Sequence, residues 1–451
     1  MNPKLLLSLS LLSILTWGSL QGEDSMENDL GGFDTEMFSE IDIEEIPVVV
    51  QKESDLSLSG DIAFKTSIAY LKHEVDRVQY SGINQAQTSL FLQLDYKISD
   101  DWKLRMSGDM FYDAIYDLNS KNYNQDVLDT YQTQVMLTDA YIQGRITNDL
   151  DLKIGHQIVV WGKSDSIRIT DVINPIDNRQ AAITDIEDLR LSVAMIKADY
   201  YFDRWNLSAM IIGENRVMLE PAPRGEFFPV DALFTPAPNP FIELITPKNS
   251  LDNMQYALAL NGVFSGWDLS FYGANVLDQK WHINPTTQKR EVSKINMLGL
   301  AINIAKGSWL LKSEIAFLNG VKYNSTTDEK NRLDFLVGFD YMGIKDTVLS
   351  LEIANRHIFD YENQMSEVVM KPDYTDKDEI QTALRATRSF ENDSINASAL
   401  LSMFGSSWQN GGFARVWVEV DLMDAVSANV GVVDYIGGDK PLLDAIEKND
   451  R

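Results

Sequence analysis

The sequence predicts an all-β fold, an antiparallel transmembrane β-barrel, on three observations. From about residue 56 onward, apolar and polar residues alternate along long segments, which is the pattern of a strand with one apolar face. These segments pair across short turns, and longer polar loops separate one pair from the next, as in outer-membrane barrels. Beyond the N-terminal region, no segment approaches the roughly 18 continuous apolar residues of a membrane helix.

The hairpin predicted at residues 86–114 shows the alternation most clearly. Leu90 and Leu92 fall on one face of its first strand, whereas Gln93 and Asp95 fall on the other. Strands of this length exceed the about five or six residues common in soluble sheets. They match the roughly nine to eleven residues that cross a bilayer at a tilt.

We expect a barrel of 18 strands, of which about 17 are present in this chain. They are predicted at residues 56–71, 86–98, 102–114, 135–146, 152–161, 191–202, 205–213, 254–264, 267–276, 295–304, 309–317, 333–341, 348–356, 380–390, 395–404, 413–422 and 426–435. An unpaired sheet edge inside lipid leaves backbone groups without hydrogen bonds. The odd count therefore indicates that the closing C-terminal strand is missing from this chain, unless one hairpin is miscounted.

The N-terminal part predicts export to the cell envelope. Residues 1–22, with Lys4 ahead of an apolar run, have the pattern of a signal peptide, and a short membrane anchor is the alternative. Residues 23–55 form an acidic leader in the periplasm, and the barrel follows at residues 56–451. Residues 44–50 resemble the short box that TonB-dependent receptors offer to their energising partner. They could add a strand to a periplasmic transport partner or serve as a linker.

Composition excludes several classes of function. The formal net charge of -28 argues against nucleic-acid binding. The absence of cysteine fits an exported protein that folds without disulfides. No two of the four histidines have the spacing of metal ligands, so we expect no metal site and no cofactor. Carboxylates such as Asp165, Asp171 and Asp185 could bind calcium, although no EF-hand register is present.

Tryptophans recur just after the predicted short turns, at Trp102, Trp205, Trp267 and Trp309. An indole at the membrane–water interface buries its ring and keeps its N–H in water. The recurrence therefore favours a membrane barrel over a soluble sandwich that packs the same rings inside.

Two long loops differ from the other connections. Residues 162–188 are polar and mixed in charge, and we expect them to fold into the lumen or over its mouth. Residues 214–252 hold more than half of the chain's 13 prolines, so they cannot join a ladder and form an outer loop. Its phenylalanines could meet an apolar substrate or pack on one another. A further outer loop is expected at residues 72–85.

The candidate pore and loop residues share a polar or aromatic side chain placed in the first of these loops or on an inward strand face. They are Lys153, Gln157, Trp161, Lys163, Asp165, Arg168, Asp171, Asn174, Asp177 and Arg179, together with Arg145, Arg415 and Glu419. Opposite charges across a pore can create a transverse field that orients solutes. Salt bridges that hold the wall together are the other interpretation.

A catalytic role is the least favoured interpretation. His156 near Ser164 or Ser166 could form part of a hydrolase site, but no Gly-x-Ser-x-Gly motif is present. We therefore expect no enzyme and no catalytic residues, with an outer-membrane hydrolase as an alternative.

Residues 155–162, GHQIVVWG, and residues 173–177, INPID, resemble the motifs of an uncharacterised proteobacterial outer-membrane family. Its porin-like barrels carry a Gly-x-Gln-x-x-x-Trp-Gly strand followed by an Asn-Pro-x-Asp loop. The resemblance implies transport of small or hydrophobic solutes. Some members are encoded near RND-type exporters and a periplasmic lipoprotein-carrier-like protein, which implies a role in envelope lipid transport as the alternative.

We therefore expect an outer-membrane porin-like channel. Its partners would be outer-membrane lipid, the barrel-assembly machinery and a periplasmic transport partner that contacts the leader. Gly155 and Gly162 would let the chain bend from the strand into the lumen.

Overall fold

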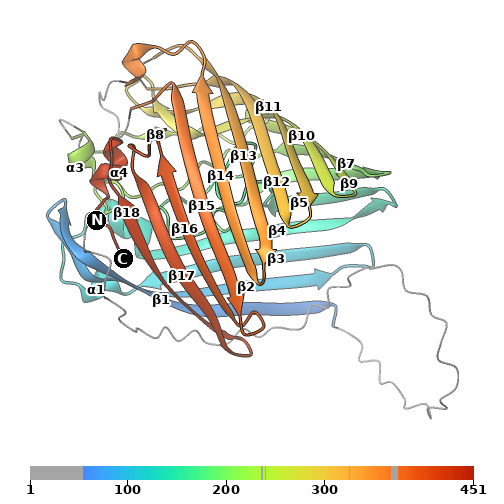
Figure 1. Ribbon diagram of the computed structural model, residues 1–451, viewed down its shortest axis with the longest axis horizontal. Coiled ribbons are helices and arrows are strands. Elements are labelled where there is room, and N and C mark those ends of the chain that lie inside the picture. The colour runs from blue at the N-terminus through green and yellow to red at the C-terminus, as the bar shows by residue number, and fades with distance from the viewer. Residues whose placement is uncertain (1–53, 235–236, 239, 325, 367–373) are drawn as a thin grey trace.

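The computed structural model describes residues 54–451 apart from 235–236, 239, 325 and 367–373 (Figure 1). Its 18 strands lie in one sheet that rolls into a barrel. The predicted signal peptide and the leader up to residue 53 lie outside the described residues.

All strands except β8 are long, and each long strand up to β17 pairs antiparallel with the next long strand along the chain. They are β1 (Leu56–Val75), β2 (Val78–Lys97), β3 (Trp102–Asp113), β4 (Thr133–Thr147), β5 (Leu150–Gln157), β6 (Val193–Phe202), β7 (Trp205–Ile212), β9 (Gln255–Phe264), β10 (Trp267–Ile283), β11 (Arg290–Lys306), β12 (Trp309–Val321), β13 (Lys330–Ile344), β14 (Thr347–Ile358), β15 (Asp378–Phe390), β16 (Ile395–Phe404), β17 (Gly412–Met423) and β18 (Val426–Ile436). The two-residue β8 (Leu244–Ile245) pairs parallel with β11. The expectation that residues 214–252 cannot join a ladder is therefore wrong at these two residues, which are not prolines and keep their backbone N–H groups. The predicted all-β barrel and its 17 strands are confirmed.

Several predicted strand ends differ from those in the structure, and two of the differences change a loop. The outer loop expected at residues 72–85 does not form, because β1 and β2 continue to a tight turn at Asp76 and Arg77. Both residues have positive φ, 47° and 65°, which is the geometry of a two-residue hairpin turn. The strand expected at residues 152–161 ends at Gln157 instead, because the next residues leave the sheet for the interior.

The two faces of the strands differ in polarity, as the alternation predicts. Large apolar side chains point outward and are exposed, for example Leu298 at 70%, Val416 at 56% and Leu258 at 54%. The inner face carries charged and polar groups, such as the in-register pair of Asp95 and Arg105. The barrel is therefore apolar outside and polar over much of its inside.

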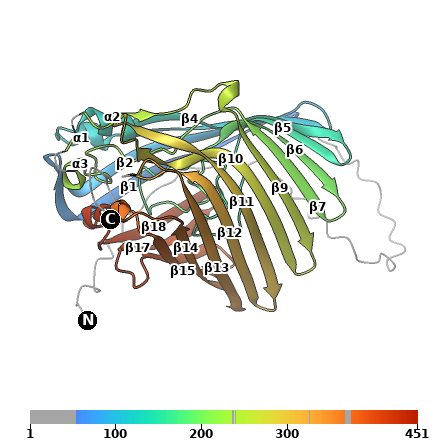
Figure 2. The same cartoon turned by 90° about the horizontal axis from the view of Figure 1, so that it is seen from above.

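The two ends of the barrel are built differently. Apart from the β1–β2 turn, the short turns lie at one end, whereas the long connections lie at the other, together with the chain's last residues (Figures 1 and 2). These connections contain α1 (Ile115–Leu118), α2 (Gln125–Tyr131), α3 (Val230–Leu233), η1 (Leu251–Asn253), η2 (Asn363–Ser366) and α4 (Pro441–Ala445). In the described part of the chain, no helix is long and apolar enough to cross a membrane.

The last two residues lie between β18 and β1 at the loop end. Arg451 exchanges backbone hydrogen bonds with Val433 of β18, at 2.8 and 3.1 Å. The carbonyl of Asp450 accepts a hydrogen bond from the N–H of Tyr70 in β1, at 3.4 Å. A closing strand beyond this point stays a prediction.

Candidate functional site

The loop between β5 and β6, residues 158–192, folds into the barrel, and we call it the inner loop. The predicted loop at residues 162–188 lies within it. Trp161 stacks on Tyr272 of β10 with ring centroids 4.6 Å apart. Ile167 and Ile169 are buried in one apolar cluster with inward-facing residues of β6 to β15, among them Met297. The first half of the inner loop thus fills an apolar part of the interior.

Glu314 of β12 is the first anchor of the inner loop and is 1% exposed. Its Oε1 accepts hydrogen bonds from the N–H groups of Lys163 and Ser164, at 2.6 and 2.8 Å. Its Oε2 accepts from the N–H and the hydroxyl of Thr170, at 3.1 and 2.6 Å. Charge-assisted bonds of this kind are stronger than neutral ones, so one wall carboxylate holds both ends of a short loop segment.

Gly162 is the residue that lets the chain approach this anchor. Its φ of +92° lies in the region that favours glycine. A Cβ at this position would come within 2.8 Å of the carboxylate of Glu314. The bend predicted at Gly162 is therefore present, and Gly155 also has a positive φ, of +131°.

Glu352 of β14, also 1% exposed, is the second anchor. It accepts the hydroxyl of Ser164 at 2.6 Å and the N–H groups of Asp165 and Ser166 at 2.9 and 3.0 Å. Next to it, Lys312 pairs with Asp165 and lies 2.8 Å from Asp340 of β13. The lysine neutralises part of the negative charge that the two wall glutamates bring together.

Asn174 closes the base of the inner loop. It is fully buried, and its side-chain amide donates to the carbonyls of Gln157 and Leu191, at 3.2 and 2.7 Å. Its Oδ1 accepts the N–H of Val159 at 2.8 Å. The side chain replaces the ladder partners that the backbone loses where β5 ends, which explains the end of that strand at Gln157.

Arg168 stabilises the turn that follows. Its guanidinium lies 3.0 Å from the carboxylate of Asp171 and donates to the carbonyls of Asp171 and Asn174, at 2.7 and 2.8 Å. Arg190 contacts the same carboxylate at 2.9 Å. Asp171 is thus shared by Arg168, three residues before it, and Arg190, near the end of the inner loop.

The second half of the inner loop contacts other sides of the barrel. Arg179 pairs with Asp177 and donates to Gln134 of β4 at 2.9 Å. Asp185 pairs with Arg385 of β15 at 2.9 Å and with Arg415 of β17. Tyr435 of β18 donates to the carbonyl of Ala181 at 2.6 Å. Because these strands lie on different sides, the inner loop crosses the interior of the barrel.

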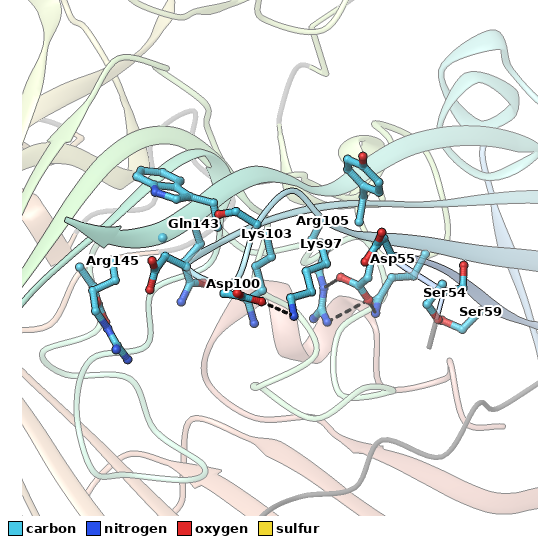
Figure 3. A pocket seen from close by; sticks show the side chains of 18 residues that line it. Ser54, Asp55, Ser59, Lys97, Asp100, Lys103, Arg105, Gln143 and Arg145 are labelled. Atoms are coloured by element: carbon cyan, nitrogen blue, oxygen red, sulfur yellow. Dashed lines mark hydrogen bonds and ion pairs between the residues drawn. The ribbon is translucent and has the colours of Figure 1, made fainter. Parts of the chain in front are cut away.

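Two cavities lie on the wall of β1 to β9. One of 580 Å³ lies at the short-turn end and is lined by polar and charged residues, including Lys97, Lys103, Arg105 and Arg145 (Figure 3). Another of 270 Å³ lies beside the start of the inner loop, between β5, β6, β7 and residues 158–161.

At the loop end, a buried charge cluster holds the outer connections together. Glu226 pairs with Arg451 at 2.8 Å and with His73 at 3.4 Å. Burial raises the pKa of Glu226, but Arg451 and His73 lower it further, so the pKa lies below its ordinary 4.5. Burial together with Asp434 raises the pKa of Asp450 to about 6.

The phenylalanines of the proline-rich loop pack on one another. Phe228, Phe234 and Phe241 make edge-to-face contacts with centroids 5.4 to 6.3 Å apart. Of the two interpretations of these rings, the structure shows packing.

Most of the predicted candidate residues lie in the inner loop or on the barrel strands that the inner loop contacts. Lys163 is among them and pairs with Asp268 at 2.5 Å. Two do not meet it: Arg145 lines the cavity at the short-turn end, and Glu419 lies near the short turn between β17 and β18. Across the described residues, no group of three or more His, Asp or Glu side chains could hold a metal ion.

The sequence did not identify the two anchors of the inner loop. Glu314 and Glu352 have inward positions in the strand alternation, but nothing in the sequence assigns the loop backbone as their partner. Each is an acidic residue at an inward strand position, but the backbone N–H groups that donate to it have no signal in the sequence.

The chain matches the model of the family described as "Protein of unknown function (DUF1302)" over residues 71–450, and it belongs to this family. No curated protein matches the sequence.

Solved structures that resemble the chain are outer-membrane proteins at low identity. OpdK of Pseudomonas aeruginosa, solved with vanillate, is 10% identical over 84% of this chain and 92% of its own, with a TM-score of 0.47. OccAB4 of Acinetobacter baumannii is 10% identical over 85% and 94%, with a TM-score of 0.46. An anion-selective porin from Comamonas acidovorans is 11% identical over 84% and 98%, with a TM-score of 0.42.

Proposed function

We propose that the protein is a porin-like channel of the outer membrane that passes small solutes, including hydrophobic ones, past the inner loop. The observation that carries the proposal is the division of the strand faces into an exposed apolar outside and a charged inside. Soluble proteins rarely expose apolar patches larger than a few hundred Å². A barrel with an apolar outer face and a polar interior is stable where lipid surrounds it.

The tryptophans at the short-turn end support the same orientation. Trp267 and Trp309 are 40% and 46% exposed on the outer face. Trp102 lies across Gly144 and Trp205 across Gly262, so their rings cover the neighbouring strand. Indoles at one level of an apolar surface favour a membrane–water interface there. The short turns would then face the periplasm.

The inner loop would determine which solutes pass through the barrel. It is fixed to β12 and β14 by buried carboxylates and to β15 and β17 by arginines, so it narrows the interior without being part of the sheet. A rigid loop of this kind can select solutes by size and charge.

We further propose that the protein transports without catalysis. His156 lies 3.6 Å from Glu214, and the hydroxyl of Ser164 donates to Glu352. His156 and Ser164, one of the two serines of the candidate hydrolase site, thus each have a different partner.

Swelling of liposomes tests the channel. Protein refolded into liposomes would be diluted into isotonic solutions of glycerol, arabinose, sodium benzoate or raffinose, with protein-free liposomes as the control. We expect swelling that is fast for the smaller solutes and slow for raffinose. No swelling beyond the protein-free control for any solute would contradict the proposal.

A further inference from the structure

A row of lysines crosses the inner wall of the barrel. In the register of the sheet, Lys97 of β2 lies opposite Lys103 of β3, which lies opposite Gln143 of β4. Gln143 lies opposite Lys153 of β5, and Lys153 lies opposite Lys197 of β6. We call these five residues the lysine row. They share the inward face, since their neighbours along each strand point to the apolar outside.

The lysine row rises from the short-turn end toward the inner loop. Lys97 is the last residue of β2, and Lys103 is the second residue of β3, whereas Lys197 lies in the middle of β6. Barrel strands are tilted, so in-register residues of successive strands lie at successive heights. At about 4.8 Å per strand, the row runs roughly 19 Å along the wall. Figure 3 shows its lower part, with Lys97, Lys103 and Gln143 in this order.

The row places like charges directly opposite each other at two points, which destabilises a sheet. Lys97 has a counter-charge in Asp100 at 2.8 Å, and Lys197 has one in Asp199 at 2.5 Å. Among the residues that the structure describes, Lys103 and Lys153 make no ion pair, and the ammonium of Lys153 lies instead 3.6 Å from the ring centroid of Tyr141 in β4. A local rule that is broken without full compensation is typical of a functional position.

The upper end of the row opens on the 270 Å³ cavity beside the inner loop. Its lining residues include Lys153 and Lys197 together with the apolar residues 158–161 of the inner loop. Val160 is 62% exposed, which is unusual for an apolar side chain inside a barrel. Gln157 also lines the cavity, and its buried Oε1 has no hydrogen-bond partner within the described chain.

We propose that the lysine row guides small organic anions with an apolar body into this cavity and that the cavity is their binding site. The carboxylate of such a solute would pair with Lys153 and Lys197, and its ring or short chain would lie on residues 158–161. Gln157 would accept a hydrogen bond from a hydroxyl of the solute. The volume lies near the lower end for ligand pockets, about 300 Å³, and suits a molecule with one ring. This inference deepens the proposed channel function and rests on it.

Calorimetric titration tests the binding site without requiring conductance. Sodium benzoate, sodium acetate and benzyl alcohol would be titrated into the refolded full chain in detergent, with detergent alone subtracted. We expect benzoate to bind at least about tenfold more tightly than acetate, which lacks the ring, and than benzyl alcohol, which lacks the charge.

Variants separate the lysine row from the general charge of the lumen. K153Q/K197Q should lose benzoate affinity by about tenfold or more, whereas the matched control K65Q, an inward lysine of β1 outside the row, should change it by less than about twofold. Equal affinities for benzoate and benzyl alcohol would overturn the proposal. So would unchanged benzoate binding by K153Q/K197Q, provided that its far-UV spectrum matches that of the wild type.

The channel function and the binding site can be tested separately. If the liposomes do not swell but benzoate binds in a lysine-dependent manner, the channel function is wrong and the binding site stands. If they swell for benzoate and arabinose alike, and benzoate does not bind, the channel stands and the binding site is wrong.

Discussion

Gly162 lies where the inner loop passes over the carboxylate of Glu314. We expect Gly162→Ala to destabilise the protein by about 1 to 3 kcal/mol, because the new Cβ meets that carboxylate and the positive φ is strained. Denaturant unfolding followed by tryptophan fluorescence measures the change.

Gly213 provides the matched control, since a Cβ there would meet nothing within 4 Å. Gly213→Ala should change the free energy of unfolding by less than about 0.5 kcal/mol. Equal stabilities of the two variants would show that the inner loop does not depend on its approach to Glu314.

Contacts between candidate residues that are close in the chain could be predicted from the sequence. Polarity and spacing placed Arg168, Asp171 and Asn174 in one functional loop, and the structure shows them in contact. Local partners of this kind follow from nearby positions in the chain. The roles of Glu314 and Glu352 could not be predicted, because their partners are backbone N–H groups of a segment far away in the sequence, and such groups have no sequence signal.

At the scale of elements, the alternation of apolar and polar residues predicted the strands well, and the turns less well. The hairpin of β1 and β2 turns at Asp76 and Arg77 without the glycine that usually marks such a turn. In β5, the apolar alternation continues past Gln157, although the chain has left the sheet. Val159 and Trp161 are apolar because they pack the inner loop, and a strand pattern cannot separate the two causes.

The segment that follows β18, residues 437–451, is expected to respond to pH in two opposite ways. The pKa of Glu226 is lowered, so its pairing with Arg451 and His73 stabilises the segment above about pH 4.5 and is lost as the pH falls further. The pKa of Asp450 is raised to about 6, so its contribution is present below about pH 3.8 and is lost as the pH rises through 6.

Hydrogen exchange measured by mass spectrometry would follow this segment from pH 3 to pH 8, after correction for intrinsic rates. We expect protection to be greatest near pH 4 to 5 and to fall on both sides. Glu226→Gln should remove the decrease on the acidic side, and Asp450→Asn should remove the decrease toward neutral pH. Protection that does not vary with pH would contradict the assigned ion pairs.

At the scale of the whole molecule, the outside of the barrel should tolerate charge far less than the inside. Leu258→Arg places a cation in the middle of β9 on the lipid face and should destabilise the folded protein in liposomes by about 2 to 4 kcal/mol. Gln93→Arg adds the same charge to the polar cavity at the short-turn end, and we expect a change below about 0.5 kcal/mol. Urea unfolding in liposomes compares the two, and an equal loss from both would argue against a lipid-facing exterior.

The central claim is that a membrane barrel holds an inner loop across its interior by two buried wall carboxylates. Single-channel conductance in planar bilayers tests it most directly, with wild-type protein compared with E314Q/E352Q. Glutamine keeps the shape but loses the charge-assisted bonds to the loop, which contribute about 1.5 to 3 kcal/mol each at most. We predict that the double variant conducts more and fluctuates between levels, whereas the wild type holds one smaller level. Identical and stable conductance in both proteins would contradict the account.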